Sequence, residues 1–517
     1  MTSLCALLLT VSGVPVAADP SGPPFDVGSR SQVFVDRALV HSAEGLEFTL
    51  HPAMKHPAGP WLSRHTDKRG PAGVVVLYDE QQKLFKSWGT ASFNTSRDGL
   101  KWSEPEANDD SWRYIVRMSV IKDQKDPDPS RRYKLLCFGP DRDFPPGLQD
   151  SDKVRNADGS ETLFWYCKGY NTYISADGRR LAHLSPKSIL LNAEGRAPGD
   201  MLNACYDGRL DRFVAFLKMT SPETKFTRRR CFAVLTSQDF EHWSEPKLVF
   251  VPDETDDAGA AARLETVRPL LRKPIDPKKA VTHIYGVGGP IQLESCVIAL
   301  LRVFTTHDKG DGASEIQMAV SRDLQHWERP FRTPIIPRGK VGKDFQSSDW
   351  DSGWFNNEGP AVEMGDEIWV YYNARNTPHD HPVGFATSQF SAQERAEARK
   401  HLGTKYLSGT GIAVWKRDRF VAVDAPAKGG TLITVPVIYA GRRLELNAAT
   451  RPGGQVVVEL LDRTGKSLAR SKPFSGDALR HRVQWETTLD LAAVAGSPVV
   501  LCFRMKNAEL YAFAFRE

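Results

Sequence analysis

Two acidic residues occupy matching places in this sequence, each a few residues ahead of the end of a short apolar run. Asp200 lies six residues before Tyr206, and Glu358 lies six residues before Met364. If both runs are strands that begin at one common opening, the two acids meet in space although they are far apart along the chain. Two carboxyl groups in different ionisation states can share proton donation and activation of water. The pair therefore predicts acid–base chemistry at one site.

Other side chains could join such a site. The further acidic candidates are Glu294, Asp351 and Asp36, with Asp67 in reserve for Asp36. Considered one at a time, each of these acids is as well explained by a structural or solvated position as by catalysis. Only for Asp200 and Glu358 is the catalytic role favoured. Aromatic side chains in loops could stack on a flat ligand, although a loop tryptophan more often anchors local packing. The candidates of this kind are Trp61, Trp350, Trp354 and Tyr170, and His379 could also reach an opening.

Composition and missing motifs exclude several classes of protein. The chain has 517 residues and a net charge of +5 from 68 basic and 63 acidic residues, too small an imbalance to indicate nucleic acid binding. It has no phosphate loop, no dinucleotide-binding glycine fingerprint, no His-Glu-x-x-His and no Gly-x-Ser-x-Gly. We therefore expect no cofactor. A channel Ca²⁺ or Na⁺ is conceivable, but no spacing of ligands supports a metal site.

A repeated phrase, Ser-x-Asp-x-x-x-Trp, indicates which elements position these residues. It is complete at Ser96–Trp102, Ser237–Trp243 and Ser321–Trp327, and it lacks only the Trp at Ser175–Leu181. A decayed fifth copy lies at Ala386–Phe390, and the copies start 79, 62, 84 and 67 residues apart. In such a phrase the Ser and Asp side chains accept backbone N–H bonds in a tight turn, Gly tolerates a left-handed conformation, and Trp covers the turn. Repetition at this period is typical of a radial β array.

The apolar runs between the copies predict five units of three or four short strands, as in a five-bladed β-propeller. We expect the propeller to occupy residues 32–424, with a helix at Ser391–His401 on its outside. After the linker Ala425–Gly430, regular strands and tight turns predict a separate antiparallel β-sandwich at 430–517. The expected fold class is all-β. Because the first strand of each blade lines a central channel, residues that begin these strands meet at one opening.

The N-terminus has the pattern of an export signal. Cys5–Val16 is a short apolar stretch, and the small residues before Asp19 suit signal peptidase, so residues 1–18 are expected to be a signal peptide and the protein to be periplasmic or extracellular. No other stretch approaches the ~18 apolar residues that a membrane span needs. Four of the remaining cysteines lie in apolar runs, where a free thiol is as plausible as a disulfide. They are Cys137, Cys231, Cys296 and Cys502.

Beyond these patterns, the sequence resembles the secreted five-bladed β-propeller glycosidases related to glycoside hydrolase families 32 and 43, in the divergent form common in planctomycete-type bacteria. The resemblance runs from about Gln32 to the C-terminus. The segments that carry it, besides the repeated turns, are Val33–Asp36, Asp200–Asp207, Asp351–Gly353, Glu358–Pro360, Gly365–Tyr372 and Leu510–Phe513.

In such enzymes a blade-one Asp is the nucleophile or base, a middle-blade Asp tunes the site, and a Glu before Gly-Pro or Ala-Pro is the general acid. The resemblance therefore implies that Glu358 is the acid, Asp200 the orienting residue and Asp36 the nucleophile or base. Glu294 or Asp351 could hold the acid's role instead, since the acid usually lies in the fourth unit. The implied activity is hydrolysis of a poly- or oligosaccharide, with the carbohydrate as partner. The alternative is a non-catalytic glycan-binding propeller, because the Asn-Asp-Pro motif of family 32 is absent.

Overall fold

The computed structural model describes most of the chain from Gly22 onwards. The described residues are 22–63, 69–156, 158–191, 200–221, 229–308, 310–357, 359–383, 390–402, 404–487 and 490–517. Contacts divide the chain into two units, His51–Arg417 and Met1–Leu50 with Asp418–Glu517. Strands dominate both units, so the all-β fold class predicted from the sequence is confirmed.

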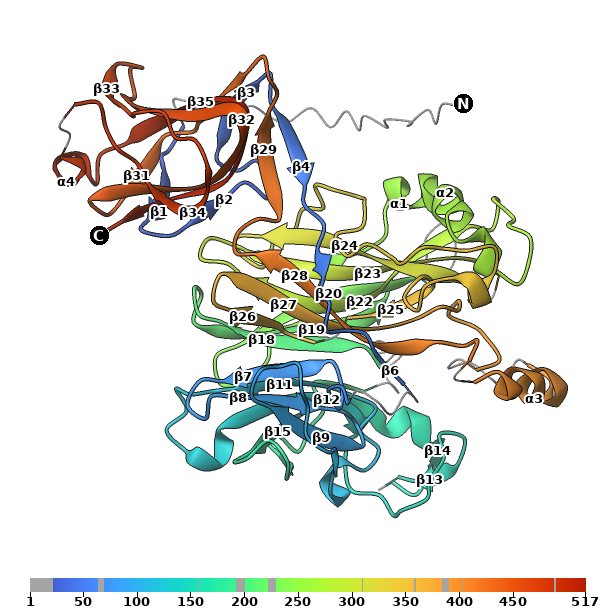
Figure 1. Cartoon of the computed structure of the whole chain (residues 1–517). Helices are drawn as coiled ribbons and strands as arrows, with labels where there is room; N and C mark the ends of the chain where they lie inside the picture. Colours follow the sequence, from blue (N-terminus) through green and yellow to red (C-terminus); the bar gives the residue numbers. More distant parts are fainter. Residues whose placement is uncertain are drawn as a thin grey trace. The chain divides into compact units, whose positions relative to one another are not determined.

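Residues His51–Arg417 form a five-bladed β-propeller in which each blade is one antiparallel sheet (Figure 1). Blade 1 contains β7 (Val75–Asp79), β8 (Leu84–Trp88), β9 (Ser92–Ser96) and β10 (Glu106–Ala107). Blade 2 contains β11 (Arg117–Lys122), β12 (Tyr133–Pro140), β15 (Lys168–Ser175), β16 (Ala182–His183) and β17 (Leu190–Leu191). Blade 3 contains β18 (Leu202–Asp207), β19 (Arg212–Thr220), β20 (Arg230–Ser237) and β21 (Lys247–Phe250).

Blades 4 and 5 complete the array. Blade 4 contains β22 (Val281–Gln292), β23 (Val297–Asp308) and β24 (Asp311–Ser321). Blade 5 contains β25 (Trp354–Asn356), β26 (Ala361–Met364), β27 (Glu367–Arg375) and β28 (Ser408–Lys416), joined by β5 (Met54–Lys55) and β6 (Trp61–Leu62). Because β5 and β6 pair with β28, the start of this unit supplies the outer strands of its last blade. The ring is thereby closed by backbone hydrogen bonds.

The first strands of the blades form an inner ring. In turn, β7 contacts β11, β11 contacts β18, β18 contacts β22, β22 contacts β26, and β26 contacts β7. Hydrogen bonds join neighbouring blades within this ring. Asn203 Nδ2 donates to the carbonyl of Val287 at 3.1 Å, and the Gly289 amide donates to the carbonyl of Gly359 at 2.9 Å. We call the face at which these first strands begin the entrance face.

The repeated turns lie at the opposite face and have the predicted hydrogen bonds. In the third copy Ser237 Oγ accepts the Phe240 amide at 2.9 Å, and Asp239 Oδ1 accepts the next two amides at 2.9 and 2.8 Å. A left-handed residue is needed, but Gly is not, since Phe240 has φ +67° and Leu324 has φ +65°. In the copy that lacks Trp, Trp88 of blade 1 donates to the carbonyl of Gly178 at 2.7 Å. A neighbouring blade thus supplies the missing indole.

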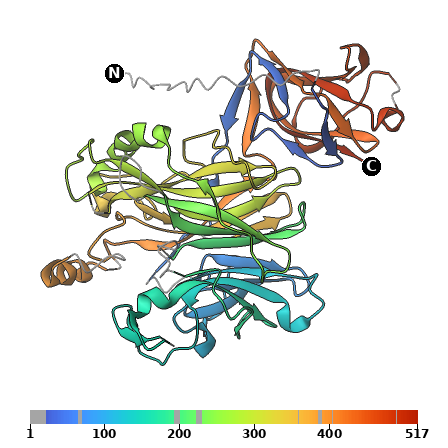
Figure 2. The same cartoon turned by 180° about the vertical axis from the view of Figure 1, so that it is seen from behind.

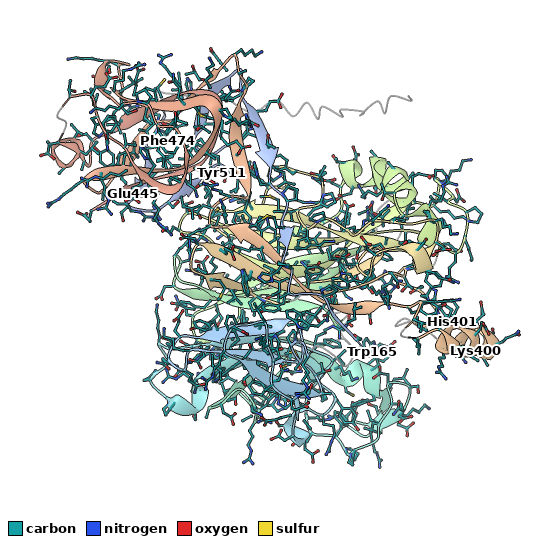
Figure 3. The ribbon with its side chains drawn as sticks, viewed as in Figure 1. Trp165, Lys400, His401, Glu445, Phe474 and Tyr511 are labelled. Atoms are coloured by element: carbon teal, nitrogen blue, oxygen red, sulfur yellow. The ribbon has the colours of Figure 1, made fainter. Side chains whose placement is uncertain are left out.

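Longer connections extend from the entrance face. Blade 2 carries the hairpin β13 (Lys153–Arg155) and β14 (Glu161–Leu163) followed by η3 (Phe164–Cys167), and the segment before blade 4 carries α1 (Glu254–Ala258), α2 (Ala260–Glu265) and η5 (Arg268–Leu270). The segment after β27 carries α3 (Ala392–Lys400). Figures 1 and 2 show these insertions on the side where β6 ends, and Figure 3 shows Trp165 of η3 and His401 after α3 on that side. The other short helices in the described part of this unit are η1 (Asp110–Trp112), η2 (Pro129–Arg131) and η6 (Phe345–Ser347).

The other unit is an antiparallel β-sandwich with one parallel strand pair, β1 with β31. Its N-terminal strands are β1 (Phe25–Gly28), β2 (Gln32–Val33), β3 (Val40–Glu44) and β4 (Glu47–Leu50). Its C-terminal elements are β29 (Val421–Ala425), β30 (Gly430–Thr434), β31 (Val437–Tyr439), β32 (Arg443–Asp462), β33 (Ser467–Arg470), β34 (Asp477–Arg482), α4 (Leu491–Val494) and β35 (Val499–Arg516). The core includes Phe34, Leu432, Phe503 and Phe474, the last of which is labelled in Figure 3.

The units differ from the ranges expected at 32–424 and 430–517. Residues 32–50 belong to the sandwich unit, because β2 pairs with β35, β3 with β30 and β4 with β29. The run Gln32–Asp36 is therefore not part of the first blade. The third strand of blade 5 is β28, and the decayed fifth turn lies mainly outside the described residues.

Several other expectations can be compared with the described residues. The predicted helix is confirmed as α3, with Ser391 as its N-cap and Glu394 completing a capping box. Every cysteine in the described part is a free thiol. The expected signal peptide at 1–18 lies outside the described residues. Within the described part, the helices are all too short or too polar to cross a bilayer.

Candidate functional site

Asp200 lies just ahead of β18, at the entrance face. Lys218 Nζ of β19 donates to Asp200 Oδ1 at 3.0 Å, with the lysine side chain 4% exposed and the aspartate side chain 29% exposed. Burial alone would raise the pKa of Asp200, but the positive charges of Lys218 and Arg117 outweigh it and hold that pKa well below its ordinary value. Asp200 is therefore an ionised carboxylate at neutral pH, and its side chain reaches solvent.

Tyr285 of β22 is surrounded by positive charge. Lys218 Nζ lies 4.7 Å from the centre of its ring, and the guanidinium carbons of Arg230 and Arg302 each lie 5.2 Å from it. Each contact is a cation–π interaction. The three basic residues come from β19, β20 and β23, so two blades bring their cations to one ring.

Arg302 joins blade 4 to blade 5 beside this ring. Its side chain is almost fully buried and donates to the carbonyl of Tyr285 at 3.1 Å, and it also hydrogen-bonds to the side chain of Asn356. The guanidinium carbon lies 5.1 Å from the ring centre of Trp354. These contacts fix Asn356 and Trp354 next to the cationic group.

Aromatic rings continue from Tyr285 into blade 5. The ring centres of Trp354 and His379 lie 5.5 and 5.3 Å from that of Tyr285, and 4.5 Å from one another. The His379 imidazole lies 2.6 Å from a carboxylate oxygen of Asp380, but burial outweighs this partner and lowers the pKa of His379. The structure therefore brings together Asp200, Trp354 and His379, three of the side chains predicted from the sequence, through Lys218 and Tyr285.

The pKa of His283 reflects its burial and the positive charges around it. Its ring lies next to Phe304, and its Nδ1 accepts the backbone amide of Arg230 at 3.3 Å. Burial and the positive charges of Arg230, Arg229 and Lys218 lower the pKa of His283 to about 3. The imidazole is thus neutral at neutral pH.

A cavity of about 460 Å³ adjoins Trp354 and Asn356 between blades 5 and 1. Its lining is polar and mostly uncharged, with Arg375 as the charged exception. The hydrogen-bonding side chains that line it are those of Ser63, Asn356, Asn373, Arg375, Asn376, Thr377, Tyr406, Ser408 and Thr410. The hydroxyl of Thr377, which is 1% exposed, has no hydrogen-bond partner among the described residues. The cavity therefore offers donors and acceptors to a neutral, hydroxyl-rich ligand.

The other acidic candidates lie elsewhere. Glu294 is exposed in the hairpin between β22 and β23, at the opposite face, nine positions after Tyr285, which is at most about 30 Å along an extended strand. Asp351 is 1% exposed, accepts the Tyr372 hydroxyl at 2.9 Å and pairs with Lys55 at 2.6 Å, so it ties the outer strand of blade 5 to the sheet. Asp36 belongs to the sandwich unit, where it accepts the Ala38 amide at 3.2 Å.

Two of the predicted aromatic platforms are packing residues. Trp61 is 6% exposed and stacks on Tyr371 in the core between blades 5 and 1. Tyr170 is fully buried, and its hydroxyl donates to the carbonyl of Lys218 at 3.0 Å. Trp350 is half-buried and stacks on Tyr372, beside Asp351 rather than beside Tyr285.

Glu358 and Asp67 lie outside the described residues. Their neighbours in sequence are described: Asn357 donates to the carbonyl of Leu300 at 3.0 Å, and Gly359 accepts the Gly289 amide. The roles suggested for Glu358 and Asp67 remain predictions.

The basic residues of the site were not foreseen. Lys218, Arg230 and Arg302 lie on second and third strands, whereas the two acids favoured from the sequence were expected to precede first strands. One signal was available, since a lysine or arginine interrupts an otherwise apolar run at Lys218 and at Arg302. A charge inside such a run indicates a buried or ligand-facing group.

Metal ligands do not gather in the described part of the propeller or of the sandwich. No group of three or more His, Cys, Asp or Glu side chains among the described residues has the geometry to hold a metal ion.

Comparisons with known proteins give only distant similarities. No family model matches the chain, and no curated protein matches it. Among solved structures, a glycoside hydrolase family 43 arabinoxylan arabinofuranohydrolase from Bacillus subtilis has 10% identity and a TM-score of 0.36, covering 90% of this chain and 99% of its own. An N-acetylgalactosamine deacetylase from F. plautii has 13% identity and a TM-score of 0.37 over 77% of this chain and 96% of its own. The Bombyx mori GH32 β-fructofuranosidase has 10% identity and a TM-score of 0.35 over 91% and 94%. At these values none carries an argument about activity, so the function is argued from the site.

Proposed function

We propose that the chain is a glycan-acting enzyme that hydrolyses a glycosidic bond in a poly- or oligosaccharide. The observation that carries this proposal is the position of Trp354 and Asn356, which border both the charged group around Asp200 and the neutral cavity. A sugar presents many hydroxyls, and the hydrogen-bonding side chains that line the cavity can pair with them, whereas Trp354 is 4% exposed and packs against its neighbours.

The proposed chemistry assigns one role to each of two carboxyl groups. Glu358 donates a proton to the leaving oxygen as the bond from the anomeric carbon breaks. A water molecule supplies the new hydroxyl, and the proton that it releases restores the acid form of Glu358. Asp200 stays ionised and stabilises the positive charge that develops on the sugar ring. The role of Glu358 rests on its place in the sequence, and the role of Asp200 rests on its ion pair with Lys218.

The test is turnover of aryl glycosides and release of reducing ends from polysaccharides by the purified full chain. We expect Glu358→Gln and Asp200→Asn to lower kcat at least about 100-fold, within the range for a lost acid or base. Glu363→Gln is the matched control, because Glu363 is 58% exposed and pairs with Arg417. Full turnover by Glu358→Gln would remove that residue from the mechanism.

A glycan-binding propeller without catalysis is the second candidate. It is favoured by one observation: the described carboxylates beside this site are already paired, Asp200 with Lys218 and Asp380 with His379. This candidate predicts that calorimetry detects binding of an oligosaccharide while no condition releases reducing sugar. Turnover that depends on Glu358 would exclude it.

We also propose that the protein is exported. The support is the apolar stretch Cys5–Val16 with small residues before Asp19. Expression of the full chain followed by N-terminal sequencing of the protein outside the cytoplasm tests this, and the expected first residue is Asp19. Retention in the cytoplasm with an intact N-terminus would contradict it.

A further inference from the structure

The group of cations around Tyr285 is unusual because of its charge. Two positive groups that each lie 5.2 Å from one ring centre, as Arg230 and Arg302 do, are at most about 10 Å apart and therefore repel one another. Lys218 adds a third charge at 4.7 Å from the same centre. The ring offsets part of this repulsion through cation–π attraction. A negative charge at this place would offset the rest.

Arg230 is the member of the group best placed to meet a ligand. It begins β20, its side chain is exposed, and it forms no ion pair with any of the described residues. The preceding Arg229 differs in every respect, since it is 4% exposed and forms two bonds of 2.8 and 2.6 Å with Asp257. Successive residues of a strand point to opposite sides. Arg229 therefore fastens the sheet to α1, while Arg230 lies over Tyr285.

The pKa values of two groups, one acidic and one basic, reflect the positive potential near these cations. Lys218 and Arg117 depress the pKa of Asp200 against the effect of its burial, whereas burial and then the charges of Arg230, Arg229 and Lys218 depress the pKa of His283. Positive potential favours an ionised carboxylate and disfavours an imidazolium, as both groups show. The potential at the entrance face beside Tyr285 is therefore positive although Asp200 is ionised.

We propose that an oxyanion of the ligand binds beside Tyr285, between Arg230 and Lys218, so that the glycan acted on is acidic. This inference rests on the proposed function and names the class of sugar: a uronic acid or a sulfate ester. The neutral cavity beside Trp354 and Asn356 takes uncharged hydroxyls of the same chain. Arginine and lysine bind carboxylate, sulfate and phosphate through the same charge-assisted hydrogen bonds. Free phosphate is thus the other source of the same chemistry.

The experiment measures binding of four probes to the full chain by saturation-transfer NMR and calorimetry. The probes are glucuronate, glucose 6-sulfate, glucose and inorganic phosphate. We expect the anionic sugars to bind at least about 10-fold more tightly than glucose, and Arg230→Gln to weaken their binding about 10- to 100-fold, as for loss of a charged hydrogen bond. Arg180→Gln is the matched control, since Arg180 is 89% exposed in a turn at the opposite face.

The possible results distinguish an acidic sugar from free phosphate as the bound anion. They also distinguish failure of the oxyanion site from failure of the proposed hydrolase. If phosphate alone binds, and Arg230→Gln abolishes it, the oxyanion site is supported and its occupant is free phosphate. If glucose binds as tightly as glucuronate, or if Arg230→Gln and Arg180→Gln behave alike, the inference is overturned. Cleavage of neutral glycans with no preference for acidic ones would overturn it while leaving the proposed hydrolase intact. Binding of acidic sugars without any cleavage would contradict the hydrolase and leave the oxyanion site standing.

Discussion

The ion pair of Asp200 and Lys218 predicts how the free energy of unfolding changes when either partner is replaced, because the two side chains differ in burial. Replacing Asp200 by Asn leaves Lys218, which is 4% exposed, without its partner at 3.0 Å. Replacing Lys218 by Met removes the charge and keeps an unbranched side chain, while Asp200 retains contact with solvent and the field of Arg117. We therefore expect the double variant to be more stable than Asp200→Asn alone.

The magnitude follows from the geometry. At 3.0 Å and an effective dielectric of about 20, the two charges attract by about 5.5 kcal/mol. Desolvation of both groups offsets much of this, and the solvent at Asp200 screens it further. We expect Asp200→Asn to cost about 3 kcal/mol, at the low end for a broken buried pair, and Lys218→Met to cost about 1.5 kcal/mol. If the double variant also costs about 1.5 kcal/mol, the coupling free energy is about 3 kcal/mol.

Urea unfolding followed by tryptophan fluorescence measures these differences in the propeller, because Trp485 is the only one of the 12 tryptophans outside His51–Arg417. Lys83→Met is the control, since Lys83 is 70% exposed and its pair with Glu80 is screened by solvent. Additive costs, or a double variant less stable than Asp200→Asn, would refute the reasoning.

Three further predictions concern the fold. Asp239→Ala removes an oxygen that accepts two amides at 2.8 and 2.9 Å and should destabilise the propeller by about 1–2 kcal/mol in the same urea assay; an unchanged midpoint would contradict this. Gly359→Ala places a Cβ into the carbonyl of Val74 across blades 5 and 1 and should lower the melting temperature by several degrees or prevent folding, whereas Gly208→Ala, with 4.0 Å of free space, should not. Trp61→Ala should cost about 3 kcal/mol or more through lost packing, and loss of ligand binding at unchanged stability would show that Trp61 contacts the ligand instead.

The architecture was predictable because its signals are local. The turn at Ser237 is recognisable from seven consecutive residues, since the Ser and Asp oxygens bond to amides two and three positions later. The outer strands of blade 5 were not predictable in this way. Their pairing joins Met54 to Val414 and Trp61 to Thr410, and no local pattern specifies a partner some 350 residues away. The same long-range pairing explains why residues 32–50 were expected in the wrong unit.

The candidate site shows the same division. Asp200 was found from its position before a strand, which is a local property. Glu294 was considered because it lies in the fourth repeat, but it follows the first strand of blade 4 instead of preceding it. The sequence shows that a charged residue lies within an apolar run, but it does not show which residues surround that charge in space. The cations were missed for this reason. Only the fold shows that Lys218 and Arg302, from different blades, lie around one tyrosine.

The ionised state of Asp200 also decides what it can do in catalysis. A carboxyl group whose pKa lies well below its ordinary value of about 3.9 has no proton to donate at neutral pH, so a second group must be the acid. Because the folded pKa is depressed, Asp200 loses its charge only as the pH falls below that ordinary value, and the acidic limb of a kcat/KM profile should not reflect Asp200 above about pH 4.

Lys218→Met tests this assignment. Without the lysine, burial raises the pKa of Asp200 and only Arg117 and a backbone hydrogen bond oppose it, so the acidic limb should move to higher pH while the alkaline limb stays in place. The alkaline limb belongs to the proton donor, since activity is lost when that group loses its proton. A profile in which Lys218→Met shifts the alkaline limb and leaves the acidic limb unchanged would mean that Asp200 is itself the proton donor, against the ion pair that the structure shows.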